Sequence, residues 1–164
     1  MEWGTLAVVA LGAVLGVGAT LITDALRSRR EQQRQWTAAK RAVYVRFLAS
    51  LAQAHSRMTV AAFREQLGPG RQQAVHDAFL SDPQHSDAKS VLRELALAAP
   101  DHVYRAANAA YEQLRSARDV LAVDPAGAAS AEYQRLIRPF FADLEDLQRL
   151  MRDDLLPPTS DRRP

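Results

Sequence analysis

The chain has 164 residues, no Cys and a formal net charge of +2. This length accommodates one membrane span and one modest domain with its own core, but not two soluble domains. The lack of Cys excludes disulfides, thiol nucleophiles and thiolate metal sites. Gly and Pro are sparse and β-branched residues are rare beyond residue 26, so local propensity predicts an all-α fold.

Residues 3–26 form a long apolar stretch, with no charged side chain between Glu2 and Asp24. A hydrocarbon core of about 30 Å is crossed by about 20 apolar residues in a helix. The stretch is long enough, so residues 1–26 are predicted to be a transmembrane anchor.

Basic residues follow this stretch and none precedes it. Residues 24–46 carry seven basic side chains against two acidic ones, whereas the rest of the chain is slightly acidic. Because Lys and Arg near a span stay on the cytoplasmic side, the N-terminus is expected outside and everything after the span in the cytoplasm of a single-pass cell-membrane protein.

Residues 27–35 are interpreted as a basic polar stalk. Its four Arg side chains are expected to meet anionic lipid headgroups, each contributing about 1 kcal/mol near the surface. The alternative is that they act only as the topology signal. These residues are Arg27, Arg29, Arg30 and Arg34.

A cleaved signal peptide is the main alternative to an anchor. Residues 16–19 resemble a small-residue cleavage site, and cleavage would release a secreted helical protein. The segment before the apolar run, however, carries Glu2 and no basic residue, and the run exceeds the usual length of a signal peptide's apolar region.

Small residues recur at four-residue spacing within the predicted span, at Gly12, Gly16 and Thr20. They share one helix face, where small side chains let a second helix approach closely, so a homodimer through this face is predicted. The alternative is that Gly and Ala are simply common in such spans.

No Pro or Gly occurs between Ala25 and Leu67, so the helix of the span is expected to continue to about residue 67. An apolar stripe with steps near three and four residues is predicted to face a core. Its members are Trp36, Val43, Phe47, Ala54, Met58 and Ala61.

Four further helices are expected, at residues 71–80, 87–98, 100–122 and 128–156. Pro100 suits the first turn of the third, and Ser86 is expected to cap the second. Their predicted inward residues are Val75, Phe79, Leu80; Val91, Leu92, Leu95; Val103, Ala107, Ala110, Leu114, Ala117, Leu121; and Tyr133, Ile137, Phe140, Leu144, Leu147, Met151, Leu155.

The predicted fold is therefore one N-terminal transmembrane helix continuing into an antiparallel bundle of about four cytoplasmic helices. The bundle is expected over residues 36–156 and a disordered tail over residues 157–164, after the helix-stopping prolines.

No arrangement of residues indicates catalysis, a cofactor or a metal ion. His55, His76, His85 and His102 are scattered without ligand spacing. Asp82, His85 and Asp87 lie close in sequence, but a turn with a helix cap explains them better. Nucleic-acid binding is not expected, because basic residues do not gather around the aromatic ones.

Three motifs carry a resemblance. Trp36 precedes KRAVYVRFLASL (residues 40–51), followed by ELALAAPDHVYRAA (94–107) and FADLEDLQRLMRDDL (141–155). The chain resembles a broad group of membrane-anchored helical proteins of high-GC Gram-positive bacteria, a group without an established activity. The resemblance implies the same anchored architecture and assigns no catalytic residue.

The function predicted from these features is a membrane-tethered interaction or scaffold module. The lipid bilayer and an unidentified protein are the expected partners. The alternative is an enzyme or small-ligand sensor with a pocket between the bundle helices near Trp36, Tyr104 or Tyr111.

Overall fold

Five α-helices and one 3-10 turn account for the regular structure of the residues that the computed structural model describes, which are 3–65, 68–80 and 87–156. Side chains are described from residue 28 onward, except that of Arg30. These residues include no strand, which confirms the all-α prediction. The first helix, α1, spans Trp3–Arg64, as expected for a stretch with no Pro or Gly between Gly18 and Gly68.

The predicted span at residues 3–26 lies outside the residues whose side chains are described. In the described part of the chain, no helix is long and apolar enough to cross a membrane.

The chain divides into two units, Met1–Ala39 and Lys40–Pro164. In the first unit, the described side chains between residues 28 and 39 are all exposed. Trp36 is 56% exposed, so the prediction that it packs in a core was wrong. A unit with one helix offers no second apolar face to bury an indole.

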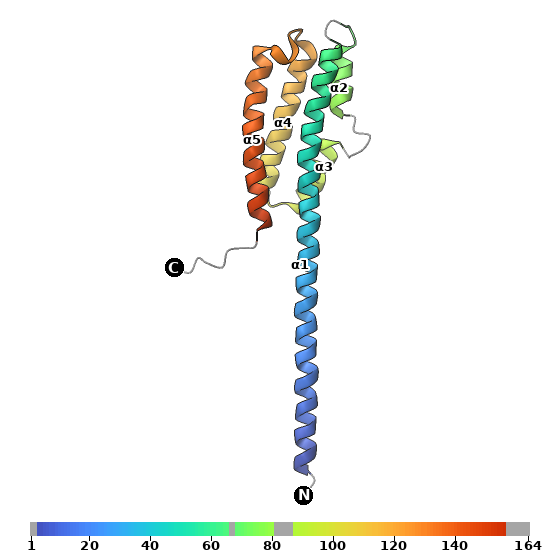
Figure 1. Ribbon diagram of the computed structural model, residues 1–164, viewed down its shortest axis with the longest axis vertical. Coiled ribbons are helices and arrows are strands. Elements are labelled where there is room, and N and C mark those ends of the chain that lie inside the picture. The colour runs from blue at the N-terminus through green and yellow to red at the C-terminus, as the bar shows by residue number, and fades with distance from the viewer. Residues whose placement is uncertain (1–2, 66–67, 81–86, 157–164) are drawn as a thin grey trace, which may run out of the picture. The chain divides into compact units, whose positions relative to one another are not determined.

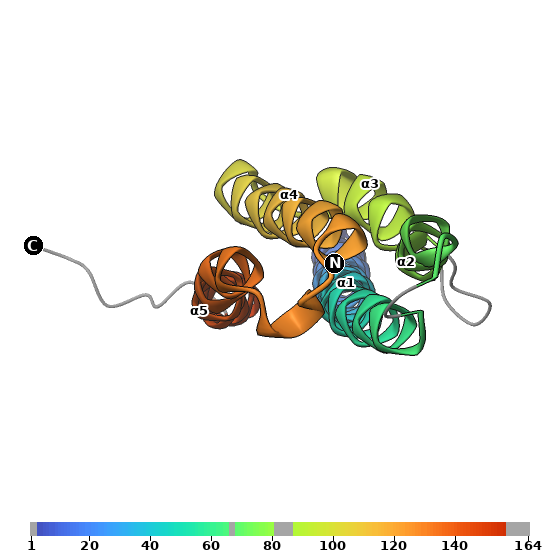
Figure 2. The ribbon, with the colours of Figure 1, turned by 90° about the horizontal axis from the view of Figure 1, so that it is seen from above.

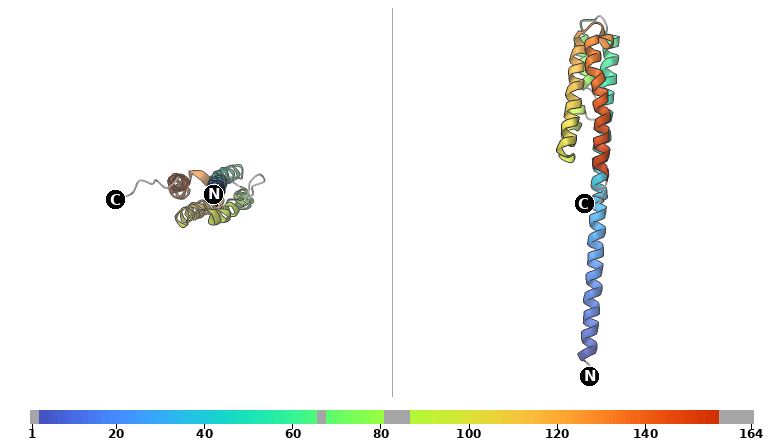
Figure 3. Two further views of the ribbon diagram at one scale, coloured as in Figure 1. Left: turned by 90° about the horizontal axis from the view of Figure 1, so that it is seen from below. Right: turned by 90° about the vertical axis from the view of Figure 1, so that its left-hand side faces the viewer.

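The second unit is an antiparallel helical bundle. It contains α1 from Lys40 onward, α2 (Arg71–Leu80), α3 (Ala88–Ala98), α4 (Asp101–Val123) and α5 (Ala131–Leu155). Seen from above, α2 and α3 lie on one side of α1 and α5 on the other, with α4 between α3 and α5 (Figure 2). Helices α4 and α5 run side by side and are joined by the short 3-10 turn Gly127–Ala129 (Figures 1 and 3).

Helix boundaries follow local chemistry. Pro100 was expected in the first turn of α4, but it lies just before that helix in an extended conformation, and the helix begins at Asp101. The Ser130 hydroxyl accepts bonds from two N–H groups at the start of α5. Helix α3 is capped by Asp87, whose carboxylate accepts from the N–H of Ser90 at 2.8 Å. The predicted cap, Ser86, lies outside the described residues.

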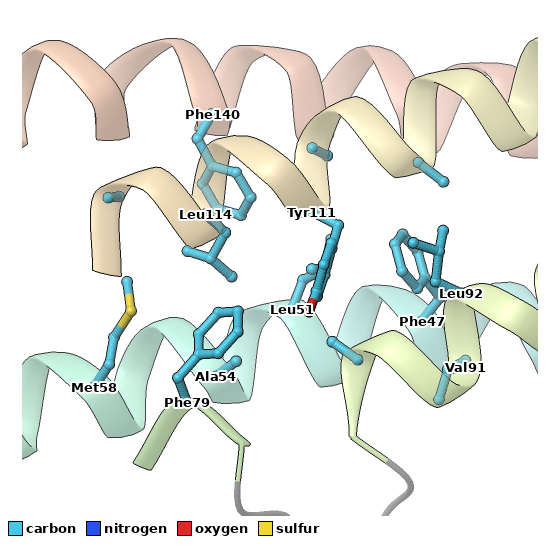
Figure 4. Packing of buried hydrophobic residues seen from close by; sticks show 14 of the residues in the cluster. Phe47, Leu51, Ala54, Met58, Phe79, Val91, Leu92, Tyr111, Leu114 and Phe140 are labelled. Carbon is cyan, nitrogen blue, oxygen red and sulfur yellow. The ribbon is translucent and has the colours of Figure 1, made fainter. Parts of the chain in front are cut away.

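One hydrophobic core joins all five helices. Figure 4 shows Phe47 and Met58 of α1, Phe79 of α2, Leu114 of α4 and Phe140 of α5 among its members. The six predicted α4 residues are all fully buried, which confirms that seam: Val103, Ala107, Ala110, Leu114, Ala117 and Leu121.

Five predicted core residues of the bundle differ from expectation. Leu80 is exposed, and the other four are only partly buried: Val43 and Ala61 of α1, and Leu144 and Leu155 of α5. Leu80 is the last residue of α2, and Leu155 is the last of α5, so neighbouring turns cover each of them on fewer sides.

Candidate interaction surface

The residues predicted to act at a membrane belong to the first unit. Arg29 and Arg34 are exposed, so both side chains are accessible from outside the protein. Arg27 and Arg30 lie outside the described side chains, as do the small residues of the predicted span, Gly12, Gly16 and Thr20.

At one end of the bundle, α1 and α5 are joined by a shielded polar cluster. The Asp154 carboxylate accepts from Lys40 Nζ at 3.0 Å and from the Tyr44 hydroxyl at 2.5 Å. The side chains of Lys40 and Asp154 are only 16% and 13% exposed. Burial, and then the hydrogen bond to Asp154 and its negative charge, raise the pKa of Tyr44, so this phenol stays a donor at physiological pH.

Farther along the same helix pair, His55 lies against α5. Its Nε2 is 3.0 Å from the Tyr133 hydroxyl, and its ring stacks on Phe140 and meets Phe141 edge-on. Burial lowers the pKa of His55 and is also the main cause that raises the pKa of Tyr133. Both groups are therefore neutral near pH 7, and the contact is a structural one.

Two buried arginines join α2 to α4. Arg71 donates from Nε and from one terminal nitrogen to the Leu121 carbonyl, at 3.1 and 2.9 Å. Arg118 lies 4.8 Å from the ring centre of Phe79 and pairs with Asp119. Each guanidinium is satisfied by the fold, which favours a structural role for both over binding an external anion.

Gly127 makes room for Arg71 at the turn before α5. Its φ of +58° is in the left-handed region, and a Cβ there would lie 3.0 Å from a terminal nitrogen of Arg71. Sequence reasoning missed these long-range contacts, although an arginine at the start of an amphipathic helix and a glycine in a turn are visible signals.

No metal-binding group of three or more His, Asp or Glu side chains occurs among the described residues. Of the three residues considered for a loop site, Asp87 caps α3, and Asp82 and His85 lie outside the described part. Tyr111 packs on Phe79 within the core, with ring centres 6.0 Å apart.

Two surface grooves of about 450 and 420 Å³ lie between these helices. One lies between α1 and α2, lined among others by Arg57, Val60 and Ala74. Another lies between α2 and α4 and includes His76 and Asp119. The residues that line these two grooves do not combine an acid, a base and a nucleophile.

Comparison of the chain with protein-family models, with curated proteins and with solved structures found no match. The resemblance to membrane-anchored helical proteins therefore stays a prediction.

Proposed function

We propose that this chain is a single-pass membrane-tethered interaction module, in which residues 1–26 are the anchor and the helical bundle is the binding part. The observation that carries the proposal is the uncharged stretch at residues 3–23 followed directly by the Arg-rich segment. Such an order supports a cytoplasmic position for the bundle. Exposure of Arg29 and Arg34 is consistent with headgroup contact by these side chains.

The bundle supports a binding role through its rigidity. Its core is continuous, and its charged contacts between helices are formed within the unit, as at Lys40 and Asp154. A rigid scaffold presents a surface to a partner with little loss of conformational entropy. The polar contacts at Lys40–Asp154, His55–Tyr133 and Arg71–Leu121 hold helices together, and we assign no catalytic role to these residues.

The anchor is tested with charged substitutions in the predicted span. Leu11→Arg combined with Leu15→Arg should move the protein from the carbonate-resistant membrane fraction to the soluble fraction, because each Arg costs about 2.5–3.5 kcal/mol at the centre of a span. Leu97→Arg is the matched control, because Leu97 is 86% exposed on α3. A double variant that stays in the membrane fraction would contradict the anchor.

The orientation is tested separately by labelling single introduced Cys residues, because the chain has no native Cys that would react with the label. In intact cells, a membrane-impermeant maleimide should label Glu2→Cys and should label Ser116→Cys only after lysis. Labelling of Ser116→Cys in intact cells would place the bundle outside. Intact mass of the mature chain distinguishes an anchored protein from one released by cleavage near Ala19.

A further inference from the structure

We draw no further inference here: the strongest candidate, the exposed apolar side of α1 at Val45, Val60 and Phe63, carries nothing, because nothing in the structure shows what covers it.

Discussion

Removing the carboxylate of Asp154 should destabilise the bundle more than removing any exposed charge. In Asp154→Ala, the Lys40 ammonium and the Tyr44 hydroxyl lose their shared acceptor. Breaking a buried ion pair costs about 3–5 kcal/mol, and a hydrogen bond to a charged group contributes about 1.5–3. Because Lys40 and Asp154 are 16% and 13% exposed, water partly replaces the lost contact. We therefore expect a loss of about 2–3 kcal/mol in the free energy of unfolding.

Urea denaturation followed by far-ultraviolet circular dichroism measures this loss. Asp153→Ala is the matched control, because Asp153 is the exposed neighbour and should change stability by less than about 0.5 kcal/mol. Tyr44→Phe, which leaves the ion pair with Lys40 intact, should cost about 1 kcal/mol. If Asp154→Ala and Asp153→Ala unfold at the same urea concentration, the cluster does not stabilise the bundle and the reasoning is refuted.

Three further predictions concern the same bundle. Burial lowers the pKa of His55, so its contribution to the free energy of unfolding should be fully present above pH 6.5 and should decrease as the pH falls below that value. His55→Gln should flatten this pH dependence in urea melts, and an unchanged pH profile of the variant would contradict the prediction. Gly127→Ala should lower the free energy of unfolding by about 1–2 kcal/mol, because Gly127 has a positive φ that alanine adopts with strain. Gly70→Ala, at a position with open space around it, should leave stability unchanged or slightly higher. Equal melting temperatures of the two variants would contradict the proposed strain at Gly127. Leu114→Ala should lower stability by about 2–5 kcal/mol and exposed Leu97→Ala by less than about 0.5, and similar values for the two would mean that α4 is wrongly oriented.

Much of the bundle could be predicted from periodicity and helix ends. In α4, apolar residues occupy one face and charged residues the other, so the pattern had a single interpretation and all six predicted positions are buried. Pro100 and the turn at Asp124 gave the boundaries of the same helix. Local signals of this kind depend on neighbours in sequence and need no knowledge of the other helices.

The inward face of α1 was predicted less well, for a physical reason. Phe47, Ala54 and Met58 are buried as expected, but the buried Tyr44 and Leu51 were missed. Apolar residues lie on the inward side of α1 and also on its exposed side, at Val45, Val60 and Phe63, so hydropathy alone did not distinguish the side that faces the core. Only the packing of the other helices decides it.

The long-range contacts between helices were the least predictable. Lys40 and Asp154 are 114 residues apart in sequence, and Arg71 reaches the Leu121 carbonyl across 50. Such pairs depend on how the helices are placed, and no local spacing indicates them. The predicted sites at Gly12 and Gly16, by contrast, depend on the spacing itself and can be tested without knowledge of the bundle.

The cluster at Asp154 also determines how the bundle would respond to a pulling force. The chain begins the bundle at Lys40, and α5 ends at Leu155, so both ends of this unit lie at the same end of the bundle. A load between them would act first on the Lys40–Asp154 pair and the Tyr44 hydroxyl. It would then separate α5 from α1 one turn at a time, because the two helices run in opposite directions. Helix α5 should therefore detach progressively at low force, while α2, α3 and α4 keep their contacts with one another.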